Sequence, residues 1–308
     1  MHAMPDSPAA LAFDRSFKPE PDAPAEAAPG IVRVTAGNGG PFTFTGTNSF
    51  IIGEHEVMVL DPGPDDATHR AALLAEIGGR PVKAILLTHT HLDHSAGAAA
   101  LKAATGAPLW FGGRHRLSRP AGLFEFNPLS RGCDWKTVPD RVLVDGEEIE
   151  IGGVRLVVIA TPGHCANHLS FGVAGSPWLL TGDHVMGWNS TLVAVPDGSM
   201  ADYLESLSKV IDLPYASYLP AHGGPIANGP AYARALLAHR RLRNSQIVEA
   251  VNGGVTRIGA LVSRIYPALR GQLRFAARMT ITAHIEYLEA AQLIVVRRGI
   301  GGTRLLPV

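Results

Sequence analysis

The chain has 308 residues, 46% of them hydrophobic, which is enough to bury a core in more than one domain. It contains no run of eighteen apolar residues, which excludes a transmembrane helix, and its two cysteines are too few for a disulfide framework. The formal net charge of zero hides an asymmetry, because residues 234–308 hold twelve Arg and three Glu without Lys or Asp. This part therefore carries +9 and the preceding part −9.

The first residues show no hydrophobic pattern. Residues 1–30 are rich in Pro, Ala, Asp and Glu, and no basic head precedes an apolar core, so we expect a flexible arm rather than a secretory signal. A cytoplasmic protein without a membrane partner is expected. Opening strands are predicted within Phe42–Ile52. The next apolar run, from Val57, ends at Asp61, where Asp-Pro-Gly63 is also typical of an ordinary turn.

Four potential metal ligands follow the next apolar run. Pro81–Leu87 is typical of a buried strand, and Thr88-His-Thr-His-Leu-Asp-His94 comes directly after it. Three imidazoles and one carboxylate suit zinc and also tolerate iron or manganese. A cluster of surface histidines is the alternative, but their concentration at a strand end favours a metal site.

Three later motifs repeat this arrangement, with an apolar run followed by His or Asp beside Gly or Pro. They are Thr161-Pro-Gly-His164 after Val154–Ala160, Thr181-Gly-Asp183 after Pro177–Leu180, and Leu219-Pro-Ala-His222 after Tyr215–Leu219. A single histidine in such a place is more often structural than a ligand. With the first cluster they make four such positions in one chain, which favours a shared site for two metals.

The pattern His89-x-His91-x-Asp93-His94, followed in order by His164, Asp183 and His222, resembles the metallo-β-lactamase superfamily of hydrolases. The resemblance covers about residues 31–230 and fills every ligand position of the two-metal pattern. It implies an α/β (α+β) fold, a four-layer αβ/βα sandwich with the metals at one sheet edge. It also implies that His89, His91 and His164 bind a first metal. Asp93, His94 and His222 would bind a second, with Asp183 bridging the pair.

The chemistry implied is attack by a metal-bound hydroxide, because two cations roughly 3.5–4 Å apart can activate water and polarise an electrophile. Asp93, which would orient the water, and Asp183, which would span both cations, are the expected catalytic residues. Asp61 is expected to support the metal site by accepting a hydrogen bond from the second ring nitrogen of a ligand histidine, as an acidic residue in this family commonly does. His168 is a weaker candidate for substrate contact, with a structural role as the alternative.

The segment after Asp183 precedes a helix predicted over Met200–Leu213. A loop at that place would approach the metals and shape substrate choice, with surface or lid packing as the alternative. Its candidate substrate contacts are Trp188, Asn189, Ser190 and Thr191.

The basic C-terminal part, residues 231–308, is predicted to form a domain of its own. Hydrophobic periodicity predicts helices over Tyr232–Val251, Val255–Tyr266 and about Phe275–Gln292, then a hairpin around Gly299–Gly302. This order, with the segment His239-Arg-Arg-Leu-Arg-Asn-Ser-Gln-Ile247, resembles one branch of the superfamily. That branch joins a hydrolase domain to a C-terminal winged helix and includes β-lactamase-like endoribonucleases.

Two functions follow from these observations. A hydrolase of a small ester, thioester or lactone comes first, because the ligand set is complete and the tail has few aromatics to stack on RNA. An endoribonuclease comes second, because arginines of the tail could neutralise phosphates; these are Arg274, Arg278, Arg297, Arg298 and Arg304. The tail could instead cap the active site, pair with the acidic first domain or form a homodimer. The expected cofactors are two divalent metal ions, zinc first, with iron or manganese as alternatives.

Overall fold

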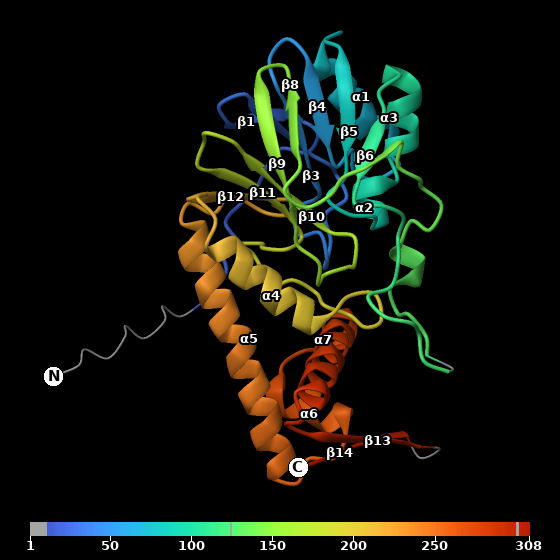
Figure 1. Cartoon of the computed structure of the whole chain (residues 1–308), viewed down its shortest axis with the longest axis vertical. Helices are drawn as coiled ribbons and strands as arrows, with labels where there is room; N and C mark the ends of the chain where they lie inside the picture. Colours follow the sequence, from blue (N-terminus) through green and yellow to red (C-terminus); the bar gives the residue numbers. More distant parts are fainter. Residues whose placement is uncertain (1–10, 124, 300–301) are drawn as a thin grey trace, which may run out of the picture.

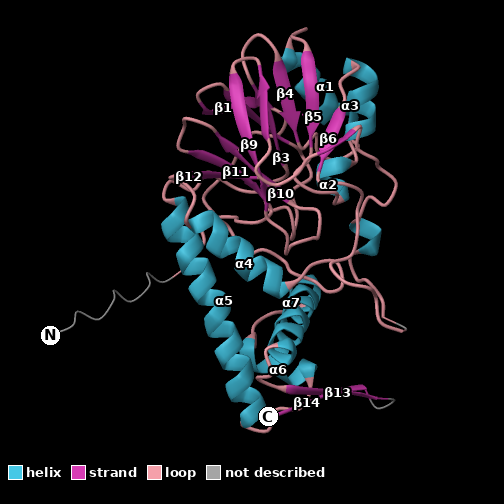
Figure 2. Ribbon diagram, in the orientation of Figure 1, coloured by secondary structure: helices cyan, strands magenta, loops and turns pink. Residues whose placement is uncertain are grey.

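The computed structural model describes residues 11–123, 125–299 and 302–308 (Figure 1). Two β-sheets lie face to face, and a group of helices with a small hairpin lies beyond one end of them. We call β1 to β12, with their helices, the sheet region, and α5 to β14 the C-terminal region. Figure 2 shows that strands dominate the first and helices the second.

The first sheet has seven strands in the order β1-β2-β3-β4-β5-β6-β7. Neighbours pair antiparallel from β1 to β4 and parallel from β4 to β7. The strands are β1 (Pro24–Ala28), β2 (Ile31–Thr35), β3 (Asn48–Ile52), β4 (Val57–Leu60), β5 (Val82–Leu86), β6 (Leu109–Phe111) and β7 (Arg141–Val142). Its helical connections are α1 (Ala67–Ile77), α2 (Leu92–Ser95), α3 (Ala98–Thr105) and the 3-10 turn Ser130–Gly132.

The second sheet has five strands in the order β12-β11-β10-β9-β8, and its one parallel pair is β11 with β12. The strands are β8 (Glu148–Ile151), β9 (Val154–Ala160), β10 (Leu169–Val173), β11 (Trp178–Gly182) and β12 (Ser217–Pro220). Helix α4 (Met200–Ile211) joins β11 to β12, and Ser199 caps it by accepting a hydrogen bond from Asp202 N.

Apolar side chains fill the space between the sheets. Phe50 and Leu86 of the first sheet share a core cluster with Val158 and Phe171 of the second. The outer face of the first sheet packs on α1 and α3, and that of the second on α4 and α5. These four layers, helix–sheet–sheet–helix, agree with the expected sandwich, and both cysteines are free and buried.

Two expectations about the N-terminal part need correction. The flexible arm predicted over residues 1–30 is too long, because Pro24–Ala28 pairs with β2 as the edge strand β1; residues 1–10 lie outside the described part. The strand predicted within Phe42–Ile52 is the third rather than the first, and it begins at Asn48, because Pro41 and Gly46 place the preceding segment in turns. Gly46 has φ +130°, and a Cβ there would lie 1.9 Å from Ala36 O.

The C-terminal region follows the predicted order of elements. Its helices are α5 (Gly229–Asn252), α6 (Ile258–Ile265) and α7 (Gly271–Ala290), and its hairpin strands are β13 (Val295–Gly299) and β14 (Gly302–Leu306). The predicted apolar stripe of α7 is buried, with Ile281, Ile285 and Leu288 in the core of this region. No helix in the described residues is long and apolar enough to cross a membrane.

The two regions are joined by packing and by one bidentate ion pair. Ala283 and Tyr287 of α7 pack against the same apolar cluster as α4. Arg119, in the loop after β6, donates to both carboxylate oxygens of Glu286 on α7 and also to Glu125. The arginine here belongs to the acidic region and the glutamate to the basic one. The opposite net charges of the two regions therefore do not account for this pair.

Candidate metal centre and its cavity

The ends of strands from both sheets bring the predicted ligands together. His89 and His91 follow β5, and the short helix α2 then carries Asp93 and His94. The second sheet supplies the ligands that follow β9, β11 and β12, which are His164, Asp183 and His222. All seven side chains meet where the two sheets end, and all but Asp93 are more than nine-tenths buried.

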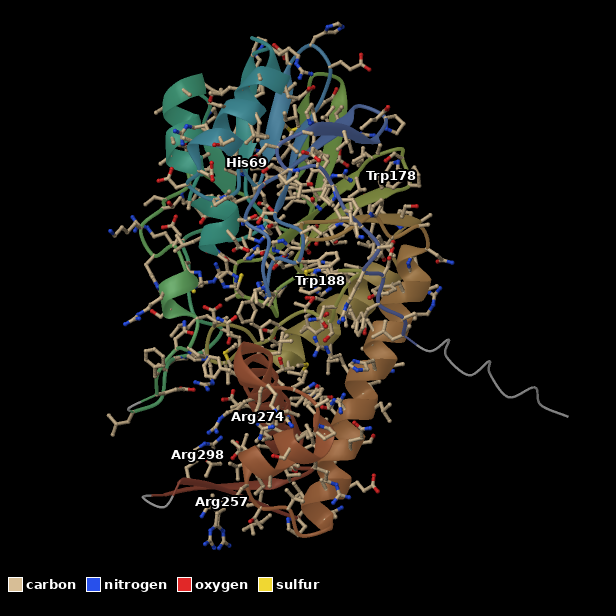
Figure 3. The ribbon with its side chains drawn as sticks, turned by 180° about the vertical axis from the view of Figure 1, so that it is seen from behind. His69, Trp178, Trp188, Arg257, Arg274 and Arg298 are labelled. Atoms are coloured by element: carbon tan, nitrogen blue, oxygen red, sulfur yellow. The ribbon has the colours of Figure 1, made fainter. Side chains whose placement is uncertain are left out.

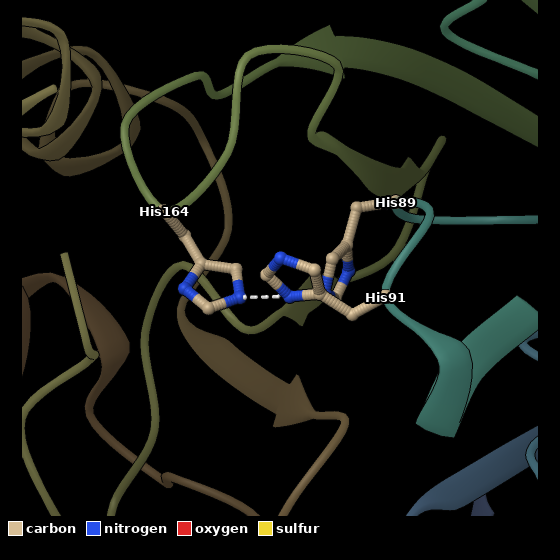
Figure 4. A group of neighbouring side chains, drawn as sticks. All are labelled: His89, His91 and His164. Carbon is tan, nitrogen blue, oxygen red and sulfur yellow. Dashed lines mark hydrogen bonds between the residues drawn. The ribbon is translucent and has the colours of Figure 1, made fainter. Parts of the chain in front are cut away.

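The first group consists of His89, His91 and His164, whose rings turn toward one another (Figure 4). His91 Nδ1 lies 3.0 Å from His89 Nε2 and 2.8 Å from His164 Nε2. Three imidazole nitrogens that converge this closely are a donor set typical of zinc.

The second group consists of Asp93, His94 and His222. Asp93 Oδ2 lies 3.3 Å from His222 Nε2 and 3.5 Å from His94 Nε2. Asp183 stands between the two groups. Its Oδ2 lies 3.5 Å from His164 Nε2, and its Oδ1 lies 3.4 Å from His222 Nε2. Each oxygen of this carboxylate therefore faces a different group.

The second ring nitrogen of each ligand histidine has a partner of its own. Thr88 Oγ1 lies 3.0 Å from His89 Nδ1, and Asp197 Oδ2 lies 2.9 Å from His91 Nε2. The Nδ1 atoms of the other three contact Asp61 Oδ2 (His94), Leu192 O (His164) and Gly46 O (His222). Such partners fix the orientation of metal-binding imidazoles.

Several inward-facing atoms have no hydrogen-bond partner. His94 Nε2, His222 Nε2 and Asp183 Oδ1 are buried and make no hydrogen bond, although they face one another at 3.4–3.6 Å. An unpaired buried polar atom is costly, so three in one place call for an explanation. A divalent cation among them would satisfy all three, and the residues present therefore fit a metal site.

The pKa values of three residues at the centre are shifted in ways that bear on cation binding. Burial alone would raise the pKa of Asp183, but His222 and His94 lower it below its ordinary value, so the carboxylate stays ionised. Burial and the neighbouring His91 lower the pKa of His164 to about 4 and keep that ring neutral. Burial lowers the pKa of His222, but the Asp183 carboxylate raises it to about 10. The carboxylates thus favour a positive charge at the His222 ring, which either a proton or a cation can supply.

Two buried carboxylates, Asp61 and Asp197, contact the ring nitrogens of His94 and His91 that face away from the centre. Asp61 accepts hydrogen bonds from Thr88 N and Thr88 Oγ1 at 2.7 Å as well as contacting His94. This is the supporting position expected from the sequence. Asp197 was not predicted; besides His91, it contacts His115 Nε2 at 2.9 Å. It stands between Pro and Gly after the apolar run Leu192–Val195, as the ligand motifs do, but that run forms no strand.

Two glycines allow the chain to pass close to the centre. Gly163 precedes His164 and has φ +137°, and a Cβ there would lie 2.4 Å from the Tyr203 backbone. Gly182 precedes Asp183 and has φ +54°, and a Cβ there would lie 2.6 Å from His168 Nε2. These positions explain why the ligand motifs contain Gly-His and Gly-Asp.

His168 has a structural position rather than one facing substrate. It is 1% exposed, its Nδ1 lies 2.8 Å from Thr161 Oγ1, and its Nε2 accepts a hydrogen bond from Asp183 N. The expectation of substrate contact is therefore corrected, because this ring holds the backbone of Asp183. Similarly, Asn48 Nδ2 donates to Pro220 O and Gly223 O, which fixes the segment that carries His222.

A cavity of about 910 Å³ opens over the centre. Asp93, His164 and Asp183 line it, and so do Trp188 and Asn189, which the sequence offered as substrate contacts. Trp188 stacks on Phe44 with 5.0 Å between ring centroids. The opposite wall comes from the C-terminal region, through Arg240, Tyr266, Leu269, Leu273, Ala277 and Thr280. This region therefore forms part of the cavity wall, a position that fits the cap considered from the sequence.

The sequence of residues 42–222 matches the metallo-beta-lactamase superfamily. The chain is 28% identical over 246 residues to a lactamase-like protein of Aspergillus niger, covering 75% of this chain and 69% of the relative. It is 30% identical over 230 residues to an atrochrysone carboxyl ACP thioesterase of Aspergillus chevalieri, covering 72% and 66%.

The solved structures show that the likeness extends into the C-terminal region. A metallo-beta-lactamase family protein from Thermus thermophilus superposes with a TM-score of 0.74 at 25% identity, over 91% of this chain and 99% of that one. The ligand geometry, the four-layer fold and the match over more than half the sequence lead to one conclusion. The chain belongs to the metallo-beta-lactamase superfamily and is a metal-dependent hydrolase.

Proposed function

We propose that the chain is a dinuclear hydrolase that cleaves a thioester or ester of a bulky apolar acyl group. The observation that carries this proposal is the position of Asp183, whose two oxygens face two separate groups of three ligands. One carboxylate between two such groups suits a bridge between two cations.

In this proposal His89, His91 and His164 hold one ion, and Asp93, His94 and His222 hold the other. Zinc fits the nitrogen-rich donor set best, and iron or manganese would be tolerated. Such ions supply Lewis-acid chemistry, by which water is activated and the substrate carbonyl is polarised. Asp93 is the ligand with the most exposed side chain, at 30%, and it lines the cavity. It is therefore placed to orient the attacking water and to receive its proton.

The cavity favours an acyl substrate. Its lining is mostly apolar, and three exposed large side chains, Phe42, Leu92 and Leu273, lie around it. Covering them with an apolar acyl group would stabilise the complex by about 25 cal/mol per Å² of apolar surface removed from water. The relative named as an acyl carrier thioesterase supports a thioester at the reacting end. Lactones and simple esters present the same carbonyl chemistry.

Hydrolysis of RNA is the second candidate, and one observation favours it. Arg297 and Arg304 stand directly opposite each other on the hairpin, an arrangement of like charges that costs stability unless an anion binds. With Arg257 and Arg298 they line a second hollow of about 300 Å³. Helices α5 to α7 followed by the hairpin would then act as a winged helix. Figure 3 shows Arg257 and Arg298 at the end of the molecule away from His69, with Trp188 between.

The test combines metal analysis with two substrates. We expect about two metal ions per chain by plasma mass spectrometry, and hydrolysis of a 2-naphthoyl thioester of N-acetylcysteamine. Asp183→Asn and Asp93→Ala should each lower turnover by roughly 10²-fold or more, as expected for a group acting on the transition state. Asp65→Asn, at a surface carboxylate 71% exposed, serves as the matched control.

The outcomes separate the two candidates. Cleavage of single-stranded RNA that is lost in Asp93→Ala, with no thioester turnover, would replace the first candidate by the second. One metal per chain, or full thioester turnover in Asp183→Asn, would contradict the dinuclear proposal.

A further inference from the structure

Arg240 is a buried cation in the wall of the cavity. It lies on α5 with 2% of its surface exposed, and it lines the same cavity as Asp183 and His164. Burying a guanidinium in a mostly apolar wall is costly unless an anion pairs with it. Arginine keeps its positive charge in such a place, because it does not lose its proton in proteins.

The protein leaves this charge incompletely paired. Arg240 Nη2 donates to Thr191 O, and its guanidinium carbon lies 5.1 Å from the centre of the Tyr203 ring. Its Nε is buried without a hydrogen-bond partner. Among the described residues no carboxylate forms an ion pair with it within 4.0 Å. The neutral carbonyl of Thr191 fixes the side chain but does not balance its charge.

The neighbouring arginines differ from Arg240. Arg241, the next residue on α5, is exposed to water. Arg15 also lines the cavity, but its side chain is exposed and donates to Trp188 O at 3.4 Å. A hydrated cation needs no partner, whereas a buried one does. Arg243, further along α5, also has a buried Nε without a hydrogen-bond partner, but it is only half-buried and does not line the cavity. Of the described arginines that line the cavity, Arg240 is therefore the buried one without a counter-charge.

We propose that Arg240 forms a subsite for a carboxylate on the substrate. In this reading the ligand is an apolar acyl compound with an anionic group at one end and the scissile carbonyl at the metal-ligand cluster. The location of the scissile bond rests on the proposed function. The carboxylate subsite itself rests on the burial and pairing of Arg240. A guanidinium can donate two parallel hydrogen bonds to a carboxylate, which gives orientation as well as affinity.

The test measures binding rather than turnover. Calorimetry on the full-length protein as purified compares 2-naphthoate with 2-naphthamide, which has the same aromatic body without the charge. We expect a preference for naphthoate of about tenfold or more, from charge-assisted hydrogen bonds. The preference should fall below about twofold in Arg240→Gln and persist in Arg241→Gln, which removes the same charge from the same helix. Arg240→Lys should retain part of it.

Metal content is measured in every variant. Variants are compared with the wild-type protein at equal metal content, so that any attraction of naphthoate to the ions is the same in both. Equal binding of the two probes to the wild-type protein would overturn the subsite, and this arm needs no folded variant. Loss of the preference in Arg15→Gln, with Arg240→Gln unaffected, would also overturn it. If the preference depends on Arg240 while no thioester is hydrolysed, the subsite stands and the proposed reaction fails.

Discussion

The sheet region and the C-terminal region share one cavity but contribute to it differently. The sheet region supplies the seven side chains that we propose as metal ligands. In each of the five histidines among them, the ring nitrogen that faces away from the centre has a partner. The C-terminal region supplies an apolar wall with one buried arginine, while other arginines such as Arg297 and Arg304 face water. In the proposed function, the sheet region carries out the chemistry and the C-terminal region selects the substrate.

The largest effect outside the ligands is expected at the two supporting carboxylates. Asp61→Asn and Asp197→Asn each leave one ligand histidine without its charged partner, and we expect metal affinity to fall about 10- to 100-fold. Competition with a chelator measures this directly. Asp145→Asn removes a remote surface contact with Lys209 and should leave the affinity unchanged. Equal metal affinity in all three variants would show that metal binding does not depend on Asp61 or Asp197.

A smaller effect is expected in the wall. Leu273→Ala removes an apolar side chain that is 43% exposed at the cavity, so the fold should tolerate it. We expect KM for a naphthoyl thioester to rise about five- to tenfold, while KM for an acetyl thioester stays within twofold. Leu242→Ala, on the same region and 57% exposed but outside the cavity, is the control. An equal rise in KM for both thioesters would contradict a role of this wall in selecting the acyl group.

The smallest effect is expected at the hairpin. Arg297→Gln combined with Arg304→Gln removes two exposed charges from the second hollow. If acyl hydrolysis is the main activity, thioester turnover should stay within about twofold, because exposed charges contribute little. Binding of a single-stranded oligonucleotide, followed by fluorescence anisotropy at two salt concentrations, provides the contrasting readout. Loss of both oligonucleotide binding and thioester turnover would show that the two regions are not separable in function.

Local patterns were sufficient to predict most elements and the side chains that converge at the centre. An apolar run followed by His or Asp beside Gly marks each strand end, so His164, Asp183 and His222 could be recognised from short segments. Asp197 was missed although it also follows an apolar run beside Gly, because that run forms no strand and the chain offers no metal-ligand position for it in the family pattern. Arg240 was read as one of several basic residues, because hydrophobic periodicity treats arginine as a surface residue.

The cavity could be predicted only in part. Trp188 and Asn189 follow a ligand closely in the sequence, so their position near the centre could be inferred. Phe44 was expected in a strand, yet it lies in a turn and stacks on Trp188. The contribution of Leu273 depends on how α7 packs against α4, α5 and α6, which no local pattern specifies.

Helix α5 begins seven positions after His222 and continues without interruption for 24 residues. Figure 1 shows it running from the end of the second sheet to the hairpin. The position of Arg240 along the chain from His222 is consequently set in large part by helical pitch, whereas the other wall residues lie on α7 and in the loop before it. Inserting one residue before Arg240 would turn the remainder of the helix by about 100° and advance it by about 1.5 Å. Homologues could thus acquire new substrate preferences through changes in helix length while their catalytic ligands remain the same.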